Sequence, residues 1–112
     1  MKNLLSVVCV LGALAVTLLA AEPVLAYDGE VYTVCKLDPS GDNYLSLRSC
    51  RSGKCAEKRR LRPGQFVWTE EPFPEGGWRA VRLMKGVNDL HPRNGLRGFV
   101  YDEYICYVDM TR

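Results

Sequence analysis

The sequence predicts a small all-β domain of five to six short strands. Short runs rich in β-branched and aromatic residues alternate between apolar and polar side chains with a period of two. Clusters of Gly, Pro, Asn and Asp separate these runs, and no segment after residue 26 has a sustained helical period. Short strands between frequent turns are typical of small, strongly bent β domains.

The first two strands are expected at residues 31–35 and 44–48, on either side of a loop rich in turn-forming residues. In the second strand, Leu45 and Leu47 alternate with polar residues. These two leucines should therefore face the core, while the other side of the strand faces solvent.

The third strand, residues 65–70, alternates in the same way and is expected to place Trp68 in the core. Two prolines and two glycines follow and end it. The fourth strand, residues 78–84, has Val81 and Leu83 on one face, which we expect to be the buried one.

A long exposed loop at residues 85–95 leads to a short fifth strand at 99–101. Residues 102–104 should form a single tight helical turn. Residues 105–108 then form the closing strand.

Residues 1–26 have the composition of a secretory signal peptide, because Lys2 precedes the apolar run 4–21 and small residues end the segment at Ala26. Cleavage there leaves residues 27–112 as one small domain. The alternative is an uncleaved anchor, since an apolar run of about eighteen residues is at the lower limit for spanning a bilayer. The expected location is secreted or periplasmic.

Four cysteines follow the signal segment, namely Cys35, Cys50, Cys55 and Cys106. An even number in an export-targeted chain predicts two disulfides, and the residues alone allow three connectivities. The cysteines lack C-x-x-C spacing and the single histidine, His91, has no ligand-type neighbour, so we expect neither a metal nor another cofactor.

The order of several short motifs resembles a bacterial SH3-type (SH3b) domain. The matching pieces are residues 44–49, Leu61-Arg62-Pro63-Gly64, Gly77-Trp78 and residues 95–105. The resemblance covers about residues 31–108 and implies an SH3-like barrel. Because the first and last strands are neighbours in such a barrel, it favours pairing Cys35 with Cys106 and Cys50 with Cys55.

The resemblance also implies a shallow groove of aromatic side chains that binds an extended peptide. Carried over by position, the groove would involve Trp78, Phe99, Tyr101 and Tyr104. Tyr101 stands where the eukaryotic peptide-binding members usually have proline, which argues against polyproline as the ligand. The alternative is that Trp78, Phe99 and Tyr104 only pack the barrel.

Seven cations fall within fifteen residues and are opposed only by Glu57. They are Arg48, Arg51, Lys54, Lys58, Arg59, Arg60 and Arg62. This basic cluster predicts attraction to an anionic partner, and the alternative is a solvated surface neutralised within the molecule. Nucleic acid is not an expected partner of an exported chain. Membrane contact through surface charge would be weak and screened by salt.

The sequence does not predict an enzyme. His91 lacks a nearby nucleophile motif, and adjacent carboxylates such as Glu70 and Glu71 point to opposite faces of a strand. The expected function is a non-catalytic binding module for an envelope protein or peptidoglycan. The alternative is an inhibitor or immunity-type protein that blocks a secreted enzyme through rigid loops at residues 50–55 or 85–95.

Overall fold

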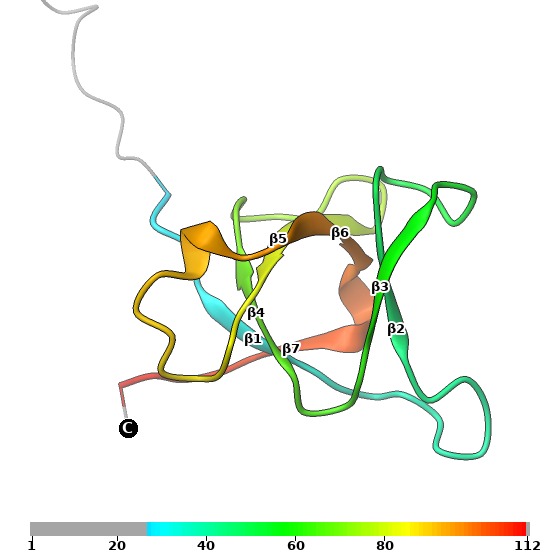
Figure 1. Cartoon of the computed structure of the whole chain (residues 1–112), viewed down its shortest axis with the longest axis horizontal. Helices are drawn as coiled ribbons and strands as arrows, with labels where there is room; N and C mark the ends of the chain where they lie inside the picture. Colours follow the sequence, from blue (N-terminus) through cyan, green and yellow to red (C-terminus); the bar gives the residue numbers. More distant parts are fainter. Residues whose placement is uncertain (1–26, 112) are drawn as a thin grey trace, which may run out of the picture.

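A computed structural model of the chain describes residues 27–111, and the predicted signal peptide at residues 1–26 lies outside this range. The described residues form one antiparallel sheet of seven strands with two single 3₁₀ turns (Figure 1). Its elements are β1 (Val31–Val34), β2 (Leu45–Arg48), β3 (Glu57–Leu61), β4 (Phe66–Thr69), β5 (Trp78–Leu83), η1 (Pro92–Asn94), β6 (Arg97–Tyr101), η2 (Asp102–Tyr104) and β7 (Ile105–Tyr107). No helix within residues 27–111 is long and apolar enough to cross a membrane.

The strands are ordered β3-β2-β6-β5-β4-β1-β7, and the sheet curls so that β2 and β3 lie across from β1 and β4 (Figure 1). The two end strands, β3 and β7, are not hydrogen-bonded to each other, so the barrel is not closed. The predicted all-β class and the single turn at residues 102–104 are confirmed. The expected number of strands, five to six, was too low.

The strand that sequence reasoning missed is β3. Four of its five residues are exposed and charged, and only Leu61 reaches the core. Such a run lacks the apolar alternation that predicts a strand, and it is a strand because it pairs with β2. Positive charge on an unpaired edge also discourages pairing with other chains.

The core lies on the concave face of the sheet, and every strand contributes to it. Its buried members are Val34, Leu45, Leu47, Leu61, Val67, Val81, Val100 and Ile105. Leu83 packs against this cluster from a partly buried position. The predicted inward faces of the second and fourth strands are therefore confirmed.

Trp68 is buried, as expected, but it lies outside the main core cluster. Its neighbour Val67 fills the core from β4, so Trp68 lies on the opposite face of the sheet. The backbone of Gly29 passes directly over the indole, where an added Cβ would lie 2.1 Å from the ring. The guanidinium of Arg93 covers it as well, 5.0 Å from the ring centroid. Segments outside the sheet bury this side chain.

The structure contains the two expected disulfides. Cys35, directly after β1, is bonded to Cys106 in β7, with their Cα atoms 6.0 Å apart. Cys50 and Cys55 close the loop between β2 and β3, with a Cα separation of 5.6 Å. Disulfides form and persist in oxidising environments, so the protein is suited to such an environment.

Candidate functional site: an aromatic groove

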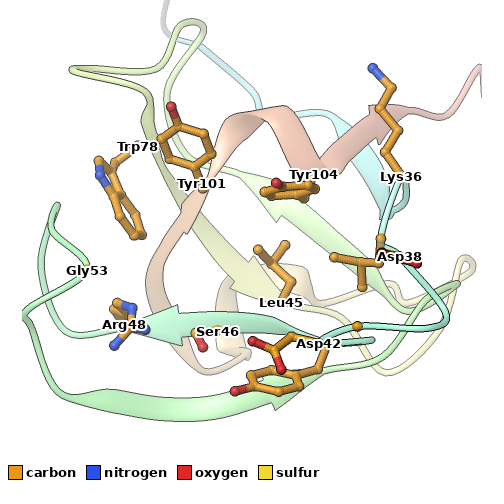
Figure 2. Close-up of a pocket in the computed structure, with 13 residues that line it drawn as sticks. Lys36, Asp38, Asp42, Leu45, Ser46, Arg48, Gly53, Trp78, Tyr101 and Tyr104 are labelled. Carbon is orange, nitrogen blue, oxygen red and sulfur yellow. The ribbon is translucent and has the colours of Figure 1, made fainter.

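A hollow of about 430 Å³ runs along β2, between that strand and the turn η2 (Figure 2). Trp78, Tyr101 and Tyr104 form one wall of it. The Trp78 and Tyr101 rings meet edge to face with centroids 5.5 Å apart, and the Tyr101 and Tyr104 centroids are 6.1 Å apart. Three of the four predicted ligand residues thus come together in this hollow, which we call the aromatic groove.

The aromatic groove has a mixed polar lining opposite its rings. Leu45 lies between the two walls, and Arg48 is at one end of β2, beside Gly53 (Figure 2). Asp38 and Asp42 lie in the loop before the other end of the same strand. Lys36 also lines the groove on the side of Asp38, so the end near Arg48 is positive and the other end is mixed in charge (Figure 2).

The rings differ in how far they reach solvent. The side chain of Tyr101 is 39% exposed, whereas Tyr104 is partly buried and also packs against the core. Trp78 is half-buried at the start of β5. The three rings therefore line the groove while Tyr104 also supports the core.

Phe99, the fourth predicted residue, does not line the groove. Two guanidinium groups lie over its ring, with Arg51 4.7 Å and Arg97 5.2 Å from its centroid. It is half-buried in β6, in a position that alternates with the buried Val100. Period-two alternation therefore places it on the face away from the core.

The basic cluster is spread over several environments. Arg48 lines the aromatic groove, and Arg51 pairs with Glu71. Arg60 pairs with Glu57, 2.9 Å from its carboxylate, and this interaction raises the pKa of Arg60. Lys54, Lys58, Arg59 and Arg62 are exposed, and Lys58 donates to the carbonyl of Arg97.

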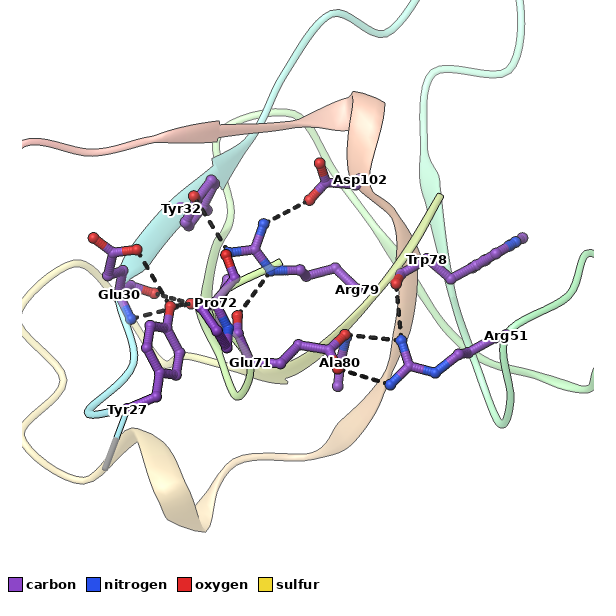
Figure 3. A network of polar contacts seen from close by, with 11 residues as sticks. Tyr27, Glu30, Tyr32, Arg51, Glu71, Pro72, Trp78, Arg79, Ala80 and Asp102 are labelled. Atoms are coloured by element: carbon purple, nitrogen blue, oxygen red, sulfur yellow. Dashed lines mark hydrogen bonds and ion pairs between the residues drawn. The ribbon is translucent and has the colours of Figure 1, made fainter. Parts of the chain in front are cut away.

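Sequence reasoning missed Arg79, a charged residue that is only 3% exposed (Figure 3). Its Nε donates to the carbonyl of Glu71 at 3.0 Å, and one Nη donates to the carbonyl of Pro72 at 3.0 Å. The other Nη donates to the carboxylate of Asp102 at 2.9 Å. Burial disfavours its charge, yet hydrogen bonds to Asp102 and Tyr32 raise the pKa of Arg79.

These bonds connect Arg79 to the groove. Asp102 begins η2, the turn that ends with Tyr104. Its backbone N–H also donates to the carbonyl of Gly77, at 2.8 Å, immediately before Trp78. Arg79 therefore helps to fix the relative positions of β5 and the turn that carries Tyr104.

A second guanidinium ties the disulfide-closed loop to the same wall (Figure 3). Arg51 donates two hydrogen bonds to the carboxylate of Glu71, both 2.8 Å, and one to the carbonyl of Trp78, 2.9 Å. The carboxylate also accepts from the N–H of Ala80 at 2.8 Å. The hydrogen bond from Arg51 is the main cause of the lowered pKa of Glu71. This fork between Arg51 and Glu71 fixes the backbone beside the groove.

The groove is assembled from residues between 36 and 104, on several strands and loops. No family model, curated protein or solved structure matches this chain. Within residues 27–111, no group of three or more His, Cys, Asp or Glu side chains is placed to hold a metal ion.

Proposed function

We propose that the protein is an exported, non-catalytic module that binds an extended peptide in the aromatic groove. The peptide belongs to an envelope protein or to the peptide stems of peptidoglycan. The observation that carries this proposal is the continuous contact of Trp78, Tyr101 and Tyr104 along one open hollow. Flat rings offer a large apolar area to an extended chain at small entropic cost.

Charge and rigidity support the same function. Arg48 at one end of the groove, and Asp38 and Asp42 together with Lys36 at the other, suit a ligand that carries both carboxylate and ammonium groups. The bonds of Arg79 and Arg51 hold the aromatic wall in place before a ligand arrives. A preorganised site loses less free energy to ordering when it binds.

The proposed location is the cell envelope or the secreted fraction. Two disulfides indicate an oxidising environment, and residues 1–26 have the pattern of a signal peptide. The resemblance to bacterial SH3-type domains favours an envelope ligand. The exposed cations of β3 add at most a weak attraction to anionic polymers or headgroups, which moderate salt removes.

Cosedimentation with purified peptidoglycan sacculi, at low and moderate salt, tests the peptidoglycan form of this proposal. We expect salt-resistant binding that Trp78→Ala weakens at least about tenfold, because a central aromatic anchor is lost. Tyr107→Ala is the matched control, since Tyr107 is an exposed aromatic residue of β7 outside the groove. Salt-resistant binding that Trp78→Ala leaves intact would contradict the assignment of the groove.

One observation favours the inhibitor alternative. In the loop 85–95, the carboxylate of Asp89 accepts hydrogen bonds from the backbone N–H groups of Lys85, at 3.0 Å, and His91, at 2.9 Å. These bonds lower the pKa of Asp89 and hold the loop, while Leu90 at its tip is 86% exposed. A loop-driven inhibitor would keep its affinity for its target enzyme when Trp78 is replaced.

A further inference from the structure

The loop between β4 and β5 carries an exposed aromatic side chain. Phe73 lies between Pro72 and Pro74, and its side chain is 78% exposed. Among the described residues only Leu90 is a more exposed large hydrophobic side chain. Rigidly presented aromatic residues of this kind are frequent anchors of protein interfaces.

The loop that presents Phe73 is held at both ends. On one side, buried Arg79 donates to the carbonyls of Glu71 and Pro72. On the other side, Glu75 and Trp78 exchange backbone hydrogen bonds of 2.8 and 3.0 Å across a tight turn. The prolines restrict the backbone further. Phe73 is thus positioned without help from a partner.

This loop adjoins the aromatic groove, since Trp78 pairs with Glu75 and its ring lines the groove. The two surfaces are complementary in charge. The side chain of Glu75 is 78% exposed, and its carboxylate lies 3.5 Å from Nε of Arg51, a guanidinium that Glu71 already neutralises, so this region keeps a net negative charge. The near end of the groove holds Arg48, which makes no ion pair within residues 27–111. An exposed apolar anchor with a negative charge therefore lies next to an aromatic groove with a positive end.

We propose that two copies of this chain associate about a two-fold axis beside Trp78, with Phe73 of each copy entering the aromatic groove of the other. The exposure of Phe73 shows that its own groove does not take it up. In a two-fold dimer each copy offers its partner both the Phe73 loop and the aromatic groove, so the contact between loop and groove forms twice. The inference rests on the groove of the proposed function, and it implies that self-association competes with the peptide ligand.

Sedimentation velocity of the oxidised protein, from about 1 to about 500 µM, tests the proposal over the range of weak specific affinities. We expect a reversible monomer–dimer equilibrium whose dissociation constant rises at least about tenfold in Phe73→Ala. Leu90→Ala removes an even more exposed apolar side chain from another loop and should leave the equilibrium unchanged. A protein that stays monomeric, or a dimer that Phe73→Ala does not weaken, would overturn the inference.

Mixing two variants tests whether the contact is reciprocal. Phe73→Ala keeps the groove and Trp78→Ala keeps the loop, so their mixture can restore one of the two contacts. We expect a heterodimer tighter than either variant alone, detected by energy transfer between labelled chains. Tyr101→Ala, which removes a ring at the groove surface, serves as a second groove variant. No preference for the heterodimer with either groove variant would refute the reciprocal contact.

Failure of this inference and failure of the proposed function can be told apart. Phe73→Ala should bind sacculi at least as well as the wild type, because the competing loop side chain is gone. Trp78-dependent binding of sacculi by a strictly monomeric protein would contradict only the proposed dimer. A Phe73-dependent dimer that binds no envelope ligand would support the proposed dimer and contradict the proposed function.

Discussion

Replacing Arg79 with methionine should lower the free energy of unfolding by about 3 kcal/mol, because breaking a buried charged network is strongly destabilising. Methionine keeps much of the apolar stem but removes every donor. The carbonyls of Glu71 and Pro72 and the carboxylate of Asp102 then lose the donors of the buried guanidinium, and the contacts between β5, the η2 turn and the loop at residues 71–72 are lost with them. Hydrogen bonds that involve a charged group contribute more to stability than neutral ones.

Urea denaturation followed by tryptophan fluorescence measures this loss. Arg79→Lys should recover only part of it, since lysine keeps the charge but cannot reproduce the planar fork of donors. Arg60→Met is the matched control, because Arg60 is solvent-exposed and its ion pair with Glu57 lies on the surface. Equal stability of the Arg79→Met and Arg60→Met variants would show that the buried network does not hold the fold.

Removing the Cys35–Cys106 disulfide by a double serine substitution should destabilise the domain by about 4 kcal/mol in the chain-entropy model. The bond joins residues 71 apart, so it restricts most of the unfolded described chain. The Cys50–Cys55 disulfide joins residues only 5 apart, and the same model gives about 2 kcal/mol for its loss. A domain this small has limited apolar area with which to offset either loss.

Urea unfolding of the two double serine variants provides the comparison. We expect the variant lacking the long-range bond to unfold at the lower urea concentration. The opposite order would mean that the short loop acts mainly through native contacts, above all the hydrogen bonds of Arg51 to Glu71 and Trp78. In that case the stabilisation would not follow the length of the closed loop.

Local patterns predicted the elements that depend on local chemistry. The alternation around Leu45 and Leu47 gave the correct buried face of β2, and the alternation around Val81 gave that of β5. The pairing of the cysteines depended instead on the resemblance, because it requires knowing which strands are neighbours. The structure places β1 beside β7 and so brings Cys35 to Cys106.

The features that the sequence did not predict, strand β3 and the face on which Trp68 is buried, depend on contacts between distant parts of the chain. Strand β3 is charged and forms because β2 is next to it. For β4, the alternation of residues defines two faces of the strand but does not determine which of them faces the core. Val67 faces the core cluster, and Gly29 and Arg93 bury Trp68 on the opposite face.

The candidate site was also predicted in part. Three of its aromatic residues were expected, but Phe99 lies outside the groove. Arg79 lies two residues before Val81 and therefore on the same, inward face of β5. A charged residue at an inward position was the signal in the sequence that could have predicted a buried network. Its acceptors lie in a loop and in η2, which a strand pattern cannot reveal.

The most direct test of the aromatic groove uses the two tryptophans as internal reporters. Trp78 lines the groove, whereas Trp68 is buried on another face of the sheet. In two-dimensional NMR spectra of the oxidised protein, titrated with soluble peptides released from peptidoglycan, the account predicts that the Trp78 indole resonance moves and the Trp68 resonance stays. A saturable shift of other resonances with Trp78 unmoved would contradict the assignment of the groove, and no shift at millimolar peptide would contradict peptidoglycan as its ligand.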